Sequence, residues 1–282
     1  MFQYVVYDVF TDKAFGGNQL AVFPDAREIP EDKLQSITAE FNFSEVTFVY
    51  PPEDPAHTAR IRIFTPTSEV DFAGHPTIGT LIALYDMGQT SPMVLELGIG
   101  PLSCTVSDAG AAFTASQPLQ LSSNPAVTLV AKVVGLAPEF IETSTHAPVV
   151  GSLGIAFVLV ELTNQTSLSA CDPNVAAMRE GFALHPDSHD FAIFAYVREG
   201  TQIESRMFAP LDNIPEDPAT GSASATLAML LTDILNTPLI LTFTQGVDMG
   251  RPSKIKVYTT QSPDTVTVEG QAVKTMSGEF IL

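Results

Sequence analysis

A turn rich in small residues runs directly into an apolar segment at 216–231, and this stretch constrains the fold most. Residues 223–235 are mostly helix formers with almost no polar face, and a helix that is apolar all round has to be buried. The first turn of a helix carries free backbone N–H groups and a partial positive charge. A buried first turn that opens with Thr220, Gly221 and Ser222 is therefore predicted to bind a carboxylate or phosphate.

The same arrangement occurs earlier in the chain. The string R-I-F-T-P at 62–66 matches R-M-F-A-P at 206–210, which lies 144 positions later. Without a gap, this shift aligns Ala73 with Asp217, and an apolar helical segment follows in both places. An internal repeat of about half the chain is the simplest interpretation.

Length and repeat together predict two domains. The chain has 282 residues and 45% hydrophobic residues, enough for a full core in each half. Pro and Ser interrupt any periodicity over 117–128, so we expect domains at 1–117 and 118–277, with a strand at 278–282 as a candidate to complete the first. Short strands are expected at 2–8, 43–50 and 60–64, with hairpins over 93–106, 239–257 and 265–274.

The charge balance excludes several classes of partner. With 13 Lys and Arg against 32 Asp and Glu, the net charge of −19 repels phosphate backbones and anionic membranes, so no nucleic-acid partner is expected. No window approaches the ~20 apolar residues of a membrane helix, and the first residues lack the basic start of a signal peptide. A cytoplasmic location is expected.

Neither the cysteines nor the histidines indicate a metal site. Cys104 and Cys171 are the two cysteines, and they stand at no metal-ligand or redox spacing. The five histidines form no H-E-x-x-H motif. The chain also has no P-loop, so we expect no metal, nucleotide or flavin cofactor.

Three residues outside the second turn are candidates for chemistry. Asn18 follows a Gly-Gly corner, Glu45 begins an expected strand, and His75 stands where the first apolar helix starts. Each also has a structural interpretation: Asn18 as a turn residue, Glu45 as a solvated acid and His75 as a capping or core histidine. Ser222 alone is more often a helix cap.

Several strings resemble one known family. They are D-V-F at 8–10, F-G-G-N at 15–18, S-E at 44–45, F-A-G-H-P-T at 72–77, E-D-P-A-T-G-S-A at 216–223, and Q-G with M-G-R-P-S at 245–253. Together they span essentially the whole chain. The sequence resembles the phenazine-biosynthesis isomerase (PhzF-like) family, whose fold is that of diaminopimelate epimerase.

The resemblance implies an α+β fold of two pseudo-symmetric domains, each a mostly antiparallel or mixed sheet wrapped around a central buried helix. It implies a cofactor-independent isomerase, often a homodimer, with its site in the cleft between the domains. Carried over by position, the family's acid/base glutamate falls on Glu45, its histidine on His75, its aspartate on Asp217 and its serine on Ser222. Gln19 replaces the proline common in the family.

The expected chemistry moves a proton between carbons of a small anionic metabolite in a biosynthetic reaction. Glu45 would remove and redeliver the proton while His75 and Asp217 assist. The helix starts at Gly74 and Gly221, with Thr220 and Asn18, would hold the substrate. A carboxylate-based amino-acid epimerase or racemase and a non-catalytic binding protein remain alternatives. A two-thiol racemase needs a cysteine at each repeated turn, and those positions hold Ala73 and Asp217.

Overall fold

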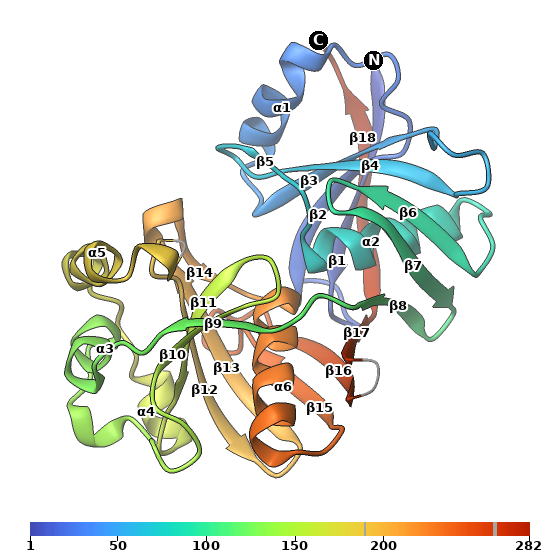
Figure 1. Cartoon of the computed structure of the whole chain (residues 1–282). Helices are drawn as coiled ribbons and strands as arrows, with labels where there is room; N and C mark the ends of the chain where they lie inside the picture. The colour runs from blue at the N-terminus through green and yellow to red at the C-terminus, as the bar shows by residue number, and fades with distance from the viewer. Residues whose placement is uncertain (189, 262–263) are drawn as a thin grey trace. The chain divides into compact units, whose positions relative to one another are not determined.

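The computed structural model describes residues 1–188, 190–261 and 264–282. The chain divides into two compact units, one formed by Met1–Ala115 with Thr267–Leu282 and the other by Ser116–Val266. In each unit a mixed sheet curls around one helix, which is the α+β class expected from the sequence (Figure 1).

The sheet of the first unit mixes parallel and antiparallel pairs. Its order is β18 (Ala272–Phe280), β1 (Phe2–Val9), β2 (Asn18–Phe23), β3 (Glu45–Tyr50), β4 (Ala59–Phe64), β6 (Met93–Leu97), β7 (Gly100–Ser107) and β8 (Gly110–Ala115). The pairs β2–β3 and β4–β6 are parallel, and the others are antiparallel. A short strand β5 (Glu69–Val70) also pairs with β4.

Helix α2 (Gly74–Asp86) is the centre of this unit. It contacts β1 and β2 near one end of the sheet and β7 and β8 at the other, so the sheet must curl around it (Figure 1). Every residue from Gly74 to Leu84 is buried, as the apolar composition predicts. The other face of the sheet is covered by η1 (Glu31–Lys33) and α1 (Leu34–Phe41) through an aromatic cluster that includes Phe23 and Phe48.

The sheet of the second unit has the order β9 (Gln120–Ser123), β10 (Val149–Ser152), β11 (Ala156–Glu161), β12 (Ile193–Glu199), β13 (Gln202–Ala209), β15 (Ile240–Gln245) and β16 (Ser253–Gln261). The short β14 (Ile214–Asp217) pairs with β13. The division between the units, after Val266, falls within β17 (Asp264–Gly270).

Helix α6 (Gly221–Leu235) takes the central place here and contacts β10, β11 and β16. The opposite face of the sheet packs on α3 (Val127–Val134), α4 (Gln165–Ser169) and α5 (Val175–Leu184), with three short turns at η2 (Pro138–Phe140), η3 (Pro186–Ser188) and η4 (Pro210–Asp212). Asn236, in the left-handed conformation, ends α6, a common role of asparagine. No helix within the described ranges is long and apolar enough to cross a membrane.

The two sheets share one pattern of pairing. From β1 to β7 the pairs are antiparallel, parallel, antiparallel, parallel and antiparallel, and the series from β10 to β16 is the same. Arg62 on β4 and Arg206 on β13 each form a two-pronged ion pair with a glutamate and lie over the ring of a phenylalanine two residues on. The internal repeat is therefore visible in the architecture.

The ungapped alignment of the repeat is wrong after the matched arginines. The central helices begin at Gly74 and Gly221, which are 147 positions apart rather than 144. The partners of the arginines, Glu69 and Glu216, show the same spacing of 147. The three extra residues lie between Phe208 and Glu216, in the segment of the second unit that contains the turn η4. Ala73 therefore corresponds to Thr220, not to Asp217.

Two further expectations differ from the structure. The segment 117–128, in which no periodic structure was expected, contains β9 and the start of α3, because the backbone of β9 completes the sheet beside β10. The strand expected at 278–282 is the end of the longer strand β18, which starts at Ala272. β18 pairs with β1 over the full length of β1.

Close packing of α2 on the sheet depends on Gly79. A Cβ atom added there would lie 2.5 Å from Leu20 Cδ2 and 2.7 Å from Val9 Cγ2. In the second unit the corresponding helix residue is Thr226, and the glycine is instead on the strand, where a Cβ on Gly151 would lie 3.2 Å from Thr226 Cγ2. Each unit thus uses one glycine to bring helix and sheet together.

We expect Gly79→Ala to destabilise the protein by about 1–3 kcal/mol, since overpacking outweighs the ~1 kcal/mol that alanine gains in helix propensity. Denaturant unfolding measures the change. Ser36→Ala, on the exposed face of α1, is the control and should be close to neutral. An unchanged or raised stability of Gly79→Ala would contradict the packing argument.

Candidate active site

Asn18, Glu45 and His75 come together in the first unit. Asn18 begins β2, Glu45 begins the parallel neighbour β3, and His75 is the second residue of α2. His75 Nδ1 lies 3.5 Å from Glu45 Oε2 and 3.4 Å from Asn18 Nδ2. Ser44 donates a hydrogen bond of 3.4 Å to Asn18 Oδ1. Three candidates that are far apart in sequence therefore form one cluster.

Burial keeps His75 neutral. The side chain is 4% exposed, and desolvation lowers its pKa to about 3, while the backbone of Gln19 acts in the opposite direction and by less. The imidazole of His75 is thus uncharged at neutral pH. A neutral ring offers one donor and one acceptor, so it can orient the Glu45 carboxylate or a ligand without competing for charge.

The amino end of α2 has no side-chain cap. Its N-cap residue is Ala73, whose carbonyl accepts hydrogen bonds from both the backbone N–H and the hydroxyl of Thr77. Pro76 has no N–H, so Gly74 and His75 supply the N–H groups of the first turn that an anion can use. These groups lie beside the cluster.

Asp217 and Thr220 come together in the second unit. Asp217 ends β14 and is 4% exposed, and Thr220 is the N-cap residue of α6. The hydroxyl of Thr220 donates to Asp217 Oδ2 at 2.6 Å. Gly221 and Ser222 form the first turn of α6, which also lacks a side-chain cap. The candidates of this half therefore surround a second helix start.

Sequence reasoning assigned no role to two buried residues of this cluster. Gln245 ends β15 and is bonded through its amide to Asp217 and Thr220, and Ser253 donates a hydrogen bond of 2.6 Å to the carbonyl of Pro218. Both belong to the Q-G and M-G-R-P-S strings that carry the family resemblance, and that was the available signal.

The corrected repeat shows that the two clusters differ at Glu45, His75 and Asp217. Val46 and Ile193 pair with the matched Phe64 and Phe208, so Glu45 corresponds to Ala192. At a spacing of 147, His75 corresponds to Ser222 and Asp217 to Val70. Neither unit repeats the other's acid.

Thiol and metal chemistry find no support in the described ranges. Cys104 lies in β7 and Cys171 precedes α5, both buried, and burial raises the pKa of each thiol to about 12. Ala73 and Thr220 occupy the positions that a two-thiol racemase would fill with cysteine. No group of three metal-binding side chains occurs in the part of the chain described.

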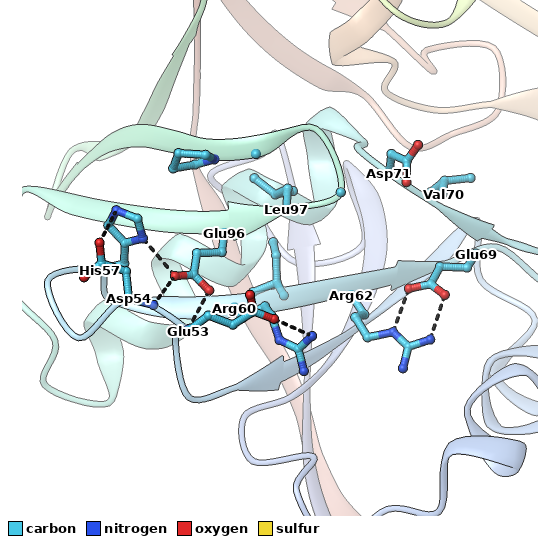
Figure 2. A pocket seen from close by; sticks show the side chains of 14 residues that line it. Glu53, Asp54, His57, Arg60, Arg62, Glu69, Val70, Asp71, Glu96 and Leu97 are labelled. Carbon is cyan, nitrogen blue, oxygen red and sulfur yellow. Dashed lines mark hydrogen bonds and ion pairs between the residues drawn. The ribbon is translucent and has the colours of Figure 1, made fainter.

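A cavity of about 470 Å³ elsewhere in the first unit contains none of the candidates (Figure 2). Acids and bases line it, and their charges are largely paired. Glu96 accepts from the backbone N–H groups of Glu53 and Asp54 and lies 2.8 Å from His57 Nδ1. These hydrogen bonds lower the pKa of Glu96 to about 2. The pairing makes this cavity a charged surface hollow rather than a reaction centre.

Comparison with known proteins identifies the family. The model of the phenazine biosynthesis-like protein family matches residues 7–278. This chain belongs to that family. The recognition from sequence is thereby confirmed, and the family relatives below carry the name isomerase, the predicted class of enzyme.

Two curated family members and one solved structure illustrate the similarity. An uncharacterised isomerase of Mesorhizobium japonicum is 37% identical and covers 99% of this chain and 98% of its own. The trans-2,3-dihydro-3-hydroxyanthranilate isomerase of Pseudomonas aeruginosa is 36% identical over 90% of this chain and 89% of its own. A PhzF-family protein of Bacillus anthracis shares the fold with a TM-score of 0.89, at 24% identity over 100% of this chain and 99% of its own.

The depressed pKa of His75 predicts how stability changes with pH. Above about pH 6.5 the His75 ring is neutral in both the folded and the unfolded protein. Between about pH 6.5 and 3, the ring binds a proton in the unfolded chain only. His75 therefore contributes a loss of stability as pH falls through this window, at most about 1.4 kcal/mol per pH unit. Relative to His75→Gln, the wild type should lose stability between pH 6 and 4 in denaturant unfolding. A pH-independent difference between the two would contradict a neutral, buried His75.

Proposed function

We propose that this protein is a cofactor-independent isomerase that moves a proton between carbons of a small carboxylate-bearing metabolite. The observation that supports it best is the cluster of Glu45 with the neutral His75 at the uncapped start of α2. A side chain that takes up and returns a proton then stands beside N–H groups suited to an anion.

In this proposal residues of both clusters act in one reaction. Glu45 takes the proton from a substrate carbon and returns it to another carbon of the same molecule. His75 and Asp217 assist by orienting the substrate so that both carbons lie within reach of Glu45. The N–H groups of Gly74 and Gly221, the Ser222 hydroxyl and the Asn18 amide hold the carboxylate and the charge that develops beside it. The divergence of the repeat supports this assignment of different roles to the two units, because neither unit has an acid at the position of the other unit's acid.

Trans-2,3-dihydro-3-hydroxyanthranilate is the first substrate to test. It is the molecule named for the relative from Pseudomonas aeruginosa, and it has the carboxylate and the ring C–H bonds that the proposal requires. Related cyclic or amino-bearing carboxylates are the next choices. The homodimer and the cytoplasmic location stay predictions. Light scattering in solution would test the homodimer.

Glu45→Gln should bind substrate but lose at least about two orders of magnitude in turnover, because general acid/base catalysis contributes 10²–10⁴-fold. Product formation in deuterated water measures both rate and proton origin. If Glu45 returns the proton that it removed, the product contains less than one full deuterium at the new C–H position. A two-base epimerase would instead introduce deuterium from the solvent and invert the configuration at one carbon. Near-normal turnover by Glu45→Gln would move the proton chemistry to Asp217 and His75.

Treatment with a chelator, followed by gel filtration, should leave turnover unchanged. The residue types in the two clusters are acid/base and hydrogen-bonding groups that need no metal to transfer a proton. Mock-treated protein is the control. Loss of turnover that is restored by one added metal ion would contradict the cofactor-independent mechanism.

A further inference from the structure

The buried amide of Gln245 has one possible orientation. Its Nε2 lies 2.7 Å from the carbonyl oxygen of Asp217 and 2.9 Å from Thr220 Oγ1, and its Oε1 accepts the Thr220 N–H at 3.2 Å. The side chain is fully buried. Rotating the amide by half a turn would place Oε1 against an acceptor and Nε2 against a donor, so the arrangement is determined by its partners.

This amide determines where the hydroxyl proton of Thr220 points. Thr220 Oγ1 already accepts a hydrogen bond from Gln245, and its one hydrogen goes to Asp217 Oδ2 at 2.6 Å. The sequence of donors therefore runs from Gln245 through Thr220 to the carboxylate. Thr220 also has its N–H bonded to Gln245, so both its polar hydrogens are used inside the protein.

The first unit shows that the fold does not need this network. By the corrected repeat, Asp217 corresponds to Val70 and Thr220 to Ala73. Gln245 corresponds to Leu97, the last residue of β6, because the next residue in each unit is a glycine packed on the equivalent loop, Gly98 on Asp71 and Gly246 on Pro218. All three polar residues are apolar there, and α2 still begins at the equivalent place.

The ion pairs of the neighbouring arginines are kept in both units, by contrast. Arg62 with Glu69 and Arg206 with Glu216 hold the strand before each helix. Residues that both units keep, such as these ion pairs, are therefore needed for the fold. Thr220 and Gln245 occur in the second unit alone, together with Asp217.

We propose that Thr220 and Gln245 are positioning residues for Asp217, which hold its carboxylate in one rotamer against the first turn of α6. This rests on the proposed function, because it specifies how the acid of the second unit is held for reaction. It also changes the role expected for Thr220 from contacting substrate to orienting the residue that does. Gly221 and Ser222 are left to contact the anion.

The structural test is independent of any substrate. In crystal structures of Thr220→Val and Gln245→Leu, the Asp217 side chain should leave its rotamer or lose order, while the start of α6 stays in place as α2 does in the first unit. Thr220→Ser, which keeps the hydroxyl, should retain the wild-type rotamer. An unmoved Asp217 in Thr220→Val, or a displaced helix start with the acid unchanged, would overturn the proposal.

The kinetic test uses a double-mutant cycle with trans-2,3-dihydro-3-hydroxyanthranilate. Thr220→Val should lower kcat by at least about tenfold with little change in KM, since small misplacements of reacting groups are costly. Thr220→Ser should stay within about twofold. In an Asp217→Asn background, Thr220→Val should not lower kcat any further. If the role of Thr220 were merely structural, Thr220→Val would lower kcat in that background too, and this result would overturn the inference.

Thr232→Val is the matched control. Thr232 is a buried threonine near the other end of α6, and its hydroxyl bonds Ala228 O and Thr259 Oγ1, away from the first turn. It should lower the melting temperature without changing kcat. The proposed function would be contradicted if Asp217→Asn were fully active, or if the wild type did not turn over this substrate. In either case the crystal structures would still decide whether Thr220 and Gln245 position Asp217.

Discussion

The burial of one apolar helix inside a curled sheet is the constraint on which each unit depends. Eleven consecutive residues of α2, Gly74 to Leu84, are buried, and removing each large aliphatic side chain from water contributes about 1.5–3 kcal/mol. The same burial carries the polar first turn of the helix out of bulk water, where free N–H groups are costly unless they find partners. A reason to bind an anion is therefore built into the fold.

Duplication of this frame was followed by divergence of its polar residues. Both units keep the arginine, its glutamate and the phenylalanine under it, and both begin the central helix at a glycine. Around that glycine the side chains differ, with an acid at the start of strand β3 in one unit and at the end of strand β14 in the other. A symmetric frame thus carries an asymmetric set of groups, which suits a reaction whose two proton positions differ.

Sequence patterns predicted the parts of this fold that depend on local properties. Two helices without a polar face and a repeated R-x-F-x-P string were enough for the internal repeat and the two central helices, whereas the α+β class followed from the family resemblance. The three-residue difference in the repeat was not visible, because the turn at η4 preserves the apolar pattern on both sides of it. The cluster of Asn18, Glu45 and His75 followed from family strings, whereas the role of Gln245 depends on β15 ending beside Asp217, a contact across 28 positions that no local pattern encodes.

The net charge of −19 and a proposed anionic substrate are compatible because they act over different distances. At physiological ionic strength the Debye length is about 8 Å, so exposed acids are largely screened from a buried site. The N–H groups at the start of α2 lie in a region of low dielectric beside an imidazole that burial holds neutral. A neutral His75 also matters for the proposed reaction, since a charged ring would form an ion pair with Glu45 and occupy the carboxylate that is proposed as the base. The electrostatics of this protein are therefore set locally, by which groups are buried, rather than by its overall charge.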